Sequence, residues 1–375
     1  MTRLLEPLTL RGTTFANRAW LAPMCQYSAV DGLPGDWHLV HLGGQAAGGF
    51  GLVLTEAAAV VPEGRISPQD AGLWNEAQVV AWRRVTDVVH ARGTLVGVQL
   101  AHAGRKASTY RPFGEGRGSV PQAEGGWATV GPSALAYPGL AAPAELTTAQ
   151  IREIPRAFAA AAVRAAEAGF DVVEVHAAHG YLLHQFLSPL SNRRTDEYGG
   201  PLENRARLLV ETTDAVRAVW PDDRPLLVRL SATDWAEGGL TVEEVTQVAK
   251  DLGGHGVDLV DVSSGGNVPA EIPVGPGYQV PAARAVREGS GLPVAAVGLI
   301  TTGQQAEQVL VDGAADVVLV GRAALRDPHW PLRAAHELGV DLSMLPLRPG
   351  APGADVVAGP VTGWQPQLVR GAWPR

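Results

Sequence analysis

The chain has 375 residues, of which 46% are hydrophobic and 18% are charged, so it can bury a large core and we do not expect it to be disordered. A formal net charge of −8 argues against nucleic acid or an anionic membrane as a partner. The single cysteine, Cys25, excludes an intramolecular disulfide and any four-cysteine zinc or iron–sulfur site. No apolar run approaches the roughly 20 residues of a membrane span, and no signal-peptide pattern opens the sequence. We therefore expect a cytoplasmic protein.

Short apolar runs recur along the chain, separated by segments of helical length. Each run is rich in Val, Leu or Ile with little alternation, as strands buried on both faces require. The eight runs span residues 18–24, 51–58, 94–102, 171–179, 225–232, 258–265, 292–298 and 316–322. Eight strands that alternate with helices predict an α/β fold, a (β/α)8 TIM barrel. The alternative is an open doubly wound sheet, which is disfavoured because no Gly-x-Gly-x-x-Gly motif follows the first run.

Capping signals mark the helices between these runs. Asn75 precedes a helical pattern that ends near Gly93. Three pairs have the spacing of a capping box: Thr147 with Gln150, Thr241 with Glu244, and Thr302 with Gln305. Pro155 falls inside another helical pattern, and we expect it to divide that helix into two pieces.

Two segments do not fit the strand–helix repeat. Residues 103–143 follow the third run and are rich in Gly, Pro and Ser, and a loop of this length is usually functional. After a barrel strand it would lie over the C-terminal face as a substrate lid. We expect one barrel domain over residues 1–345. The tail at 346–375 ends in "GWQPQLVRGAWPR", a composition that suggests docking on a neighbouring subunit, with a free end as the alternative.

Three titratable residues close the fourth run. They are His176, His179 and Tyr181. Because the C-terminal ends of barrel strands converge on one site, we expect these side chains to belong to it. The histidines could bind a metal together with a carboxylate such as Glu56 or Glu174. They could instead act as general acid and base, or donate hydrogen bonds to a carbonyl oxygen as neutral rings. Residue types alone do not choose among these roles.

Arg229 lies inside the fifth run, where an isolated charge would be very costly. A structural ion pair with Glu56 or Glu174 is one explanation. Gln99 in the third run likewise presents a donor and an acceptor to something polar. A flat heterocycle with polar edges would satisfy both Arg229 and Gln99.

Glycines end the last two runs. Gly298 and Gly321 leave backbone N–H groups open to a ligand, and Arg322 adds a positive charge. Because TIM barrels commonly bind phosphate at the ends of their seventh and eighth strands, we predict a phosphate site there.

Five longer motifs follow one another along the chain. They are "LAPMCQYSAVDGLPGDWHLVHL", "GRISPQDAGLW", "VQLAHAGRKA", "AGFDVVEVHAAHGYLLHQFLSPLSNRRTDEYGGPLENRARLL" and "DVVLVGRAALRDPHWPLRAA". In these motifs and in their order, the chain resembles the old yellow enzyme family over residues 1–335. It is most similar to the bacterial thermophilic-like branch, which has a cysteine beside the flavin.

The resemblance implies an FMN-containing barrel that uses NADPH or NADH to reduce activated C=C bonds. The flavin-contacting positions that it implies are Ala22, Pro23, Met24, Cys25, Ala57, Gln99, Arg229, Gly298, Gly321 and Arg322. Arg229 would stabilise the negative charge of the reduced flavin, and Cys25 would modulate its potential.

The resemblance also implies the substrate site. His176 and His179 would bind the carbonyl oxygen of an activated alkene, and Tyr181 would protonate its α-carbon. Tyr27 would be a second tyrosine that contacts the substrate. Members of this branch often insert a C-terminal arginine into a neighbouring subunit, and Arg370 is the candidate here, which implies a homodimer or homotetramer.

Two other functions stay open at this point. A metal-dependent barrel hydrolase would use His176 and His179, but it leaves Arg229 and Gln99 without a role and has no evident third ligand. A flavin-binding redox sensor would act through Cys25 without turnover, and it leaves the catalytic set idle.

Overall fold

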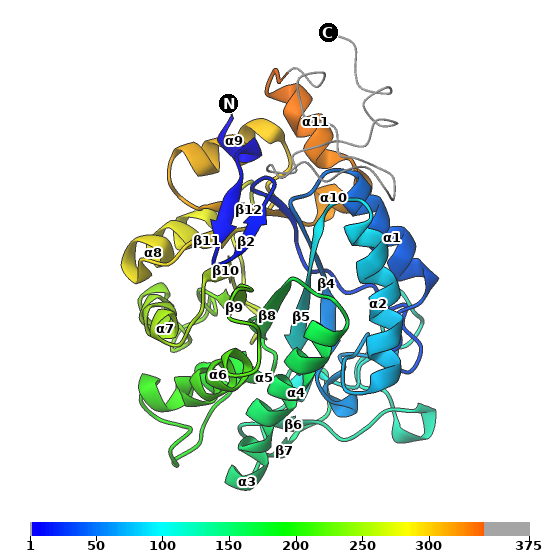
Figure 1. The fold of residues 1–375 in the computed structure, drawn as a ribbon. Coiled ribbons are helices and arrows are strands. Elements are labelled where there is room, and N and C mark those ends of the chain that lie inside the picture. The colour runs from blue at the N-terminus through cyan, green and yellow to red at the C-terminus, as the bar shows by residue number, and fades with distance from the viewer. Residues whose placement is uncertain (1, 341–375) are drawn as a thin grey trace.

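Eight parallel strands close into a barrel at the centre of the molecule (Figure 1). The structure is a computed structural model that describes residues 2–340. The barrel strands are β3 (Ala19–Leu21), β4 (Leu52–Ala59), β5 (Leu95–Ala101), β8 (Val172–Ala177), β9 (Leu226–Ser231), β10 (Leu259–Ser263), β11 (Val294–Ala296) and β12 (Val317–Val320). Each lies within one of the eight apolar runs or overshoots it by one residue, so the prediction of a TIM barrel is confirmed.

Helices surround the barrel (Figure 1). They are α1 (Asp36–Ala47), α2 (Glu76–His90), α3 (Thr148–Ile151), α4 (Glu153–Glu167), α5 (Leu182–Leu187), α6 (Leu202–Arg217), α7 (Val242–Gly254), α8 (Val280–Ser290), α9 (Gly303–Val311), α10 (Arg322–Arg326) and α11 (Trp330–Glu337). The predicted capping residues Asn75, Thr147, Thr241 and Thr302 each accept a hydrogen bond from the residue three positions on. Pro155 lies in the first turn of α4, where its missing N–H breaks no helical bond, and the chain is divided just before that turn.

A separate apolar cluster fills the N-terminal half of the barrel. The larger core cluster includes residues from the surrounding helices, whereas this one contains none and therefore lies inside the strands. Its members include Trp20, Leu52, Val172, Leu227 and Leu259, one from each of five strands. The barrel interior is thus a packed core at this end.

A short hairpin closes this end of the barrel. It consists of β1 (Leu8–Leu10) and β2 (Thr13–Phe15), which pair antiparallel. Leu10 and Phe15 join the interior cluster, and the ring of Phe15 lies 4.4 Å from that of Trp20. No pattern in the sequence predicts this hairpin, because its three-residue strands are too short to show a period.

The inside of the barrel becomes polar toward its C-terminal end. Two residues beyond Val172, Leu227 and Leu259 on the same inward face come Glu174, Arg229 and Asp261. All three are buried. This change from apolar to charged side chains positions the site, because it places polar groups at one end of a rigid apolar core.

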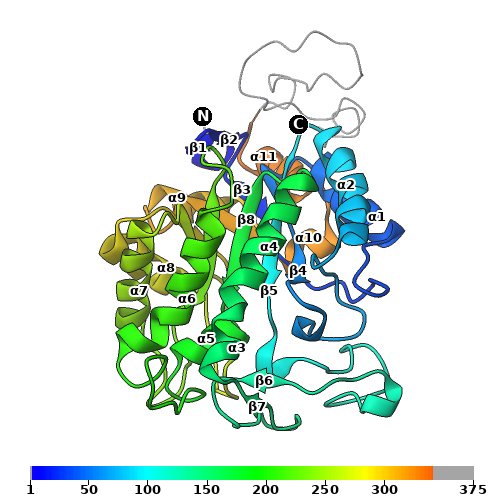
Figure 2. The same ribbon diagram turned by 60° about the horizontal axis from the view of Figure 1, so that its bottom comes forward.

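The long excursion after β5 lies at the end of the molecule opposite the N-terminal hairpin (Figure 2). It contains the short elements η3 (Gly104–Lys106), η4 (Gln122–Glu124) and β6 (Val130–Gly131), and β6 pairs with β7 (Ala144–Glu145). Its position is that expected for 103–143, and its role as a substrate lid stays a prediction. The predicted domain boundary at 345 and the tail at 346–375 lie outside the described residues.

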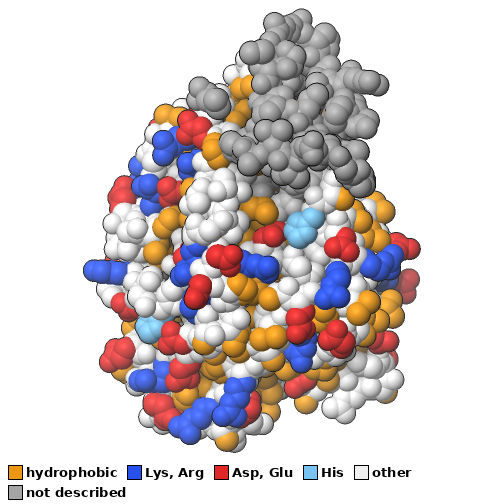
Figure 3. All heavy atoms as spheres, in the orientation of Figure 1, with side chains coloured by type: hydrophobic (Ala, Val, Ile, Leu, Met, Phe, Trp, Pro, Cys, Tyr) orange, Lys and Arg blue, Asp and Glu red, His pale blue; other side chains and the backbone are white. Residues whose placement is uncertain are grey.

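The visible surface is of mixed charge. Acidic and basic side chains are interspersed over the face shown in Figure 3. Within residues 2–340, every helix is too short or too polar to cross a bilayer.

We expect Phe15→Ala to reduce the free energy of unfolding by about 3–5 kcal/mol, because it leaves a cavity beneath Trp20. Chemical denaturation would measure the change. Phe113→Ala is the matched control, since that ring is 68% exposed and its loss should change stability by less than about 0.5 kcal/mol. Equal effects of the two substitutions would show that the hairpin does not support the barrel.

Candidate active site

The turn after β8 carries His179 and Tyr181 in a constrained backbone. His179 has φ +58°, a left-handed conformation that is uncommon for a residue other than glycine. Its N–H donates to Ser231 Oγ at 2.9 Å, and its carbonyl accepts from Lys106 Nζ at 2.8 Å. The next N–H, that of Gly180, donates to His184 Nδ1 at 2.8 Å. Three buried or partly buried side chains thus hold this turn in place.

Only glycine fits at position 180. A Cβ there would lie 2.3 Å from the carbonyl oxygen of Gly266, and the residue has φ +72°. The turn after β8 and the loop after β10 therefore touch backbone to backbone. Lys106 joins them from the excursion, because its Nζ also donates to the Gly266 carbonyl at 2.9 Å.

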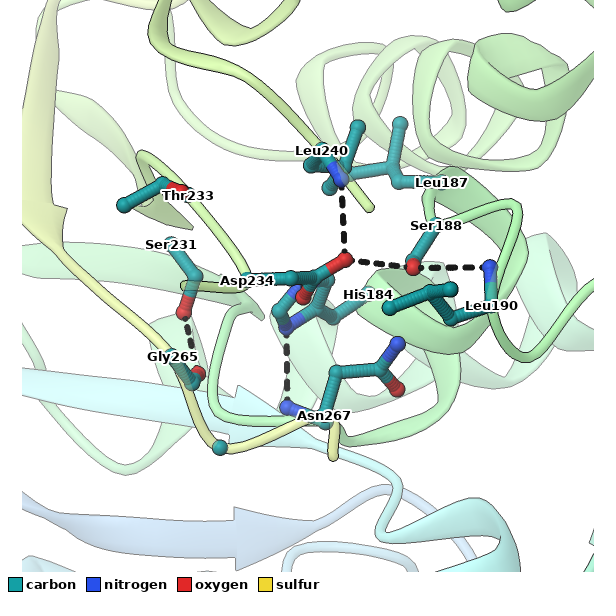
Figure 4. A network of polar contacts seen from close by, with 12 residues as sticks. His184, Leu187, Ser188, Leu190, Ser231, Thr233, Asp234, Leu240, Gly265 and Asn267 are labelled. Carbon is teal, nitrogen blue, oxygen red and sulfur yellow. Dashed lines mark hydrogen bonds and ion pairs between the residues drawn. The ribbon is translucent and has the colours of Figure 1, made fainter. Parts of the chain in front are cut away.

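His184 is in turn held by a buried carboxylate. Its Nε2 lies 3.0 Å from Asp234 Oδ1, and both side chains are inaccessible to solvent. The other oxygen of Asp234 accepts from Ser188 Oγ and from Leu240 N, as Figure 4 shows. Burial raises the pKa of Asp234, but the contact with His184 and the hydrogen bonds from Ser188 and Leu240 outweigh it and hold that pKa below its ordinary value. The ionised carboxylate thus orients the ring that supports the turn.

His176 and His179 form one chain of hydrogen-bonding groups. Ala178 N–H donates to His176 Nδ1 at 3.2 Å, which leaves the ring proton of His176 on Nε2. That Nε2 lies 3.3 Å from His179 Nδ1, and His179 Nε2 lies 2.7 Å from Ser263 Oγ. Ser263 can donate onward to Gln279 Oε1 at 3.3 Å. Each of these hydrogen bonds has one donor and one acceptor when both rings are neutral.

The electrostatics agree with neutral histidines. Burial, followed by the positive charge of Arg229, holds the pKa of both His176 and His179 well below its ordinary value. Burial also raises the pKa of Tyr181 well above its ordinary value, so the phenol keeps its proton. The Tyr181 ring stands perpendicular to that of His176, with centroids 5.0 Å apart. The structure therefore brings the three residues at the end of β8 together.

Cys25 and Tyr27 lie beside the same site. Cys25 and Tyr181 pack on one small apolar cluster formed by Ile66, Ala103 and Ala107. Burial, then the charges of Asp70 and Glu56, raise the pKa of the Cys25 thiol, and Tyr27 hydrogen-bonds to it. Tyr27 has φ +51°, and its pKa is likewise raised, mainly by burial.

The ion pair that the structure gives Arg229 is with neither Glu56 nor Glu174, the two carboxylates offered as one explanation of its charge. Arg229 Nε lies 2.9 Å from Asp261 Oδ2 on the neighbouring strand. Glu56 instead pairs with His38 Nε2 at 2.7 Å, and its other oxygen accepts from Gln26 N at 2.9 Å. The same rule that selected Arg229, a lone charge in an apolar run, would have found Asp261 in "LVDVS".

A cavity of about 160 Å³ opens at the C-terminal ends of β9 to β12. Four residues predicted to bind the cofactor line it: Arg229, Gly298, Gly321 and Arg322. A Cβ on Gly321 would lie 3.7 Å from Met24 Sδ and 3.8 Å from Ala22 Cβ, so these two residues border the same place. Gly298 has φ +126°, which L-residues with side chains rarely adopt.

The remaining predicted residues are distributed around this region. Pro23 is buried and directly follows Ala22, and Ala57 is the register partner of Gln99 between β4 and β5. His102, which directly follows β5, lies away from the site. It lines a different cavity with Leu146 and Ile154, next to α4. Arg370 lies outside the described residues.

Sequence reasoning missed several residues that shape the site. They are His38, Lys106, His184, Asp234, Ser263 and Gln279. Three of them are charged or titratable side chains that become buried, and their partners come from distant strands and loops. No local pattern marks them, because each is defined by its contact with another element.

Comparisons with known proteins agree with this geometry. Residues 3–341 match the model of the NADH:flavin oxidoreductase / NADH oxidase family. The chain is 48% identical to the NADPH dehydrogenase of Geobacillus thermodenitrificans over 344 residues, which cover 91% of this chain and 96% of that protein. It is also 48% identical to the NADPH dehydrogenase of Listeria innocua over 342 residues, which cover 90% and 96%.

Solved structures show the same fold. Morphinone reductase superimposes with a TM-score of 0.76 and 30% identity, over 91% of this chain and 90% of that one. A 2-naphthoyl-CoA reductase complex superimposes with a TM-score of 0.82 and 27% identity over 91% of this chain, which spans only 53% of that longer chain.

The fold, the polar strand ends and these relatives define a barrel oxidoreductase that uses FMN together with NADPH or NADH. The chain belongs to the NADH:flavin oxidoreductase / NADH oxidase family, the old yellow enzymes. This membership leaves the metal-dependent hydrolase without support. Among residues 2–340, moreover, no group of three or more His, Cys, Asp or Glu side chains is arranged to hold a metal ion.

The residues present fit FMN. The guanidinium nitrogen Nε of Arg229 is buried without a hydrogen-bond partner, and the same residue lines the cavity with the open backbone of Gly321. Gly298, Gly321 and Arg322 would hold a phosphate, and Arg229 with Gln99 would meet the polar edge of a flat ring.

We expect Cys25 to react with iodoacetamide at pH 8 at least about tenfold more slowly than free cysteine, whose pKa is about 8.5. The reason is that the raised pKa leaves almost no thiolate. Mass spectrometry of the purified enzyme over time measures the rate. The rate in urea is the control, and it should approach that of free cysteine. A native rate equal to the unfolded one would contradict the raised pKa of the thiol.

Proposed function

We propose that the protein is an FMN-dependent ene-reductase that acts on α,β-unsaturated carbonyl compounds such as enones, enals and maleimides, and on nitro compounds. The observation that carries the proposal is the pair of neutral histidines beside a protonated tyrosine, next to the cavity of Arg229. When bound, FMN supplies two-electron chemistry, in which a hydride is accepted from NADPH or NADH and delivered to the β-carbon of the alkene.

The histidines bind and polarise the substrate oxygen. A neutral imidazole N–H donates a hydrogen bond that strengthens as negative charge develops on that oxygen. His176 uses its Nε2–H only in a long 3.3 Å contact, so this proton is available to a ligand. His179 must release Ser263, which its Nε2 contacts at 2.7 Å, before both rings meet at one oxygen. Substrate binding thus exchanges one protein hydrogen bond for another.

Tyr181 supplies the proton for the α-carbon. Its raised pKa keeps the phenol protonated at every physiological pH. Lys106 Nζ lies 5.2 Å from the centre of its ring and also holds the His179 carbonyl, so the proton donor and the oxygen-binding group share one support. Tyr27, which hydrogen-bonds to Cys25, lies beside them as a further substrate contact.

The assembly part of the proposal extends beyond the described residues. Arg370 of a neighbouring subunit would complete the substrate pocket in a homodimer or homotetramer. The single cysteine next to the site supports assignment to the thermophilic-like branch, in which this arrangement occurs. A flavin sensor that signals through Cys25 without turnover is the competing function.

The purified enzyme should be yellow, bleach on anaerobic addition of NADPH, and regain its colour when 2-cyclohexenone is added. Tyr181→Phe should slow the recovery by about 10²–10⁴-fold and leave the bleaching rate unchanged, because only the second step needs the phenolic proton. Stopped-flow absorbance measures both steps. A yellow enzyme that bleaches but ignores the enone would favour the sensor, and a variant with wild-type recovery would assign the proton to another group.

We expect His176→Ala and His179→Ala each to weaken the binding of a para-substituted phenol by about 10–100-fold, since each removes a hydrogen bond to a negatively charged oxygen. Titration of the flavin spectrum with the phenol measures this affinity. Retention of FMN is the internal control, and it should stay near that of the wild type. Wild-type phenol affinity in both variants would remove the histidines from the substrate site.

A further inference from the structure

Four polar side chains form a layer inside the barrel, directly above its apolar core. They are Gln99 on β5, Glu174 on β8, Arg229 on β9 and Asp261 on β10, and none is more than 6% exposed. Gln99 Nε2 donates to Glu174 Oε1 at 2.7 Å, and Arg229 Nε lies 2.9 Å from Asp261 Oδ2. We call this group the charge layer.

The charge layer contains one cation and two carboxyl groups. If both carboxyls were ionised, the layer would carry an unbalanced negative charge in a place without water contact. Glu174 Oε2 and both oxygens of Asp261 lack a hydrogen-bond donor, and the Arg229 N–H does not point at the oxygen it attracts. A buried and incompletely paired carboxylate is costly, and such a group retains a proton instead.

Glu174 is the carboxyl that retains the proton. Burial, then the negative charge of Asp261, raise its pKa to about 8, although Arg229 and Gln99 act in the opposite direction. Burial raises the pKa of Asp261 only to about 6, because Arg229 opposes it. The other titratable group on the inward face of β8 is His176, which is neutral. Glu174 is therefore the carboxyl of the charge layer that keeps its proton to the higher pH.

We propose that Glu174, wherever it is ionised, takes up a proton from solvent when the bound FMN is reduced, so that Arg229 can stabilise the negative charge that the electrons bring. The inference rests on the proposed function only in that FMN lies against Arg229. Two electrons and one proton enter the flavin, and a second proton converts the Glu174 carboxylate to the carboxylic acid. The layer thereby gains one positive charge as the flavin gains one negative charge.

The number of protons taken up on reduction should increase as the pH rises. Below about pH 8 Glu174 already holds its proton, so reduction takes up one proton for each two electrons. Above that pH the carboxylate is ionised, and the negative charge of the reduced flavin draws a second proton onto it. For a two-electron couple, one proton changes the midpoint potential by about 30 mV per pH unit. The slope should therefore rise from about 30 to about 60 mV per pH unit above pH 8.

Spectroelectrochemical titration of the FMN-loaded enzyme between pH 6.5 and 9.5 tests the inference. Glu174→Gln preserves the size and hydrogen bonding of the side chain but cannot ionise. The midpoint potential of this variant should therefore change by about 30 mV per pH unit, the slope for one proton, over the whole range. The two proteins should have equal potentials at pH 7. At pH 9.5 the variant should favour the reduced state by roughly thirtyfold, which is about 45 mV. A constant one-proton slope in the wild type, or a steepening slope in Glu174→Gln, would overturn the proposal.

Asp261→Asn provides a second test, which remains possible if Glu174→Gln does not fold. It removes the negative charge that raises the pKa of Glu174, so the change of slope should begin at lower pH than in the wild type. An unchanged onset would also overturn the proposal. The titration needs bound FMN but no enone. An enzyme that shows the second proton and ignores enones would thus contradict the proposed substrate and leave the role of Glu174 intact.

Discussion

One buried guanidinium governs the arrangement of the active end of the barrel. Arg229 lies on an inward-facing strand position where a charge is tolerated only with partners, and it is shared between Asp261 and the cavity. Its positive charge also helps keep His176 and His179 neutral. The charge that suits a flavin edge thus also preserves the hydrogen-bond donors that suit a substrate oxygen.

The apolar half of the barrel makes this possible. Charges can be held in fixed positions because the strands that carry them are anchored two residues earlier by Val172, Leu227 and Leu259. Leu10 and Phe15 of the N-terminal hairpin pack onto the same cluster at that end. Polar preorganisation at one end therefore depends on close packing at the other.

The turn after β8 shows how strain is maintained at the site. His179 keeps a left-handed backbone because Ser231, Lys106 and His184 satisfy its peptide groups and the one that follows. These three come from a neighbouring strand, the excursion after β5 and the helix after the turn. An unusual conformation persists here because several independent elements determine it together. Lys106 also lies over the ring of Tyr181, which gives the predicted lid a direct contact with that residue.

The sequence by itself determined the barrel and the strand ends from which its polar residues converge. Buried parallel strands must be apolar on both faces, so eight runs of Val, Leu and Ile predicted eight strands, and a lone Arg229 in such a run was noticeable. Only the tertiary structure decided that Arg229 pairs with Asp261 and not with Glu56, because pairing depends on the order and register of neighbouring strands. The hairpin of Phe15 and the support of His179 by His184 and Asp234 were likewise decided in three dimensions. Such contacts join segments far apart in the chain, and no local period encodes them.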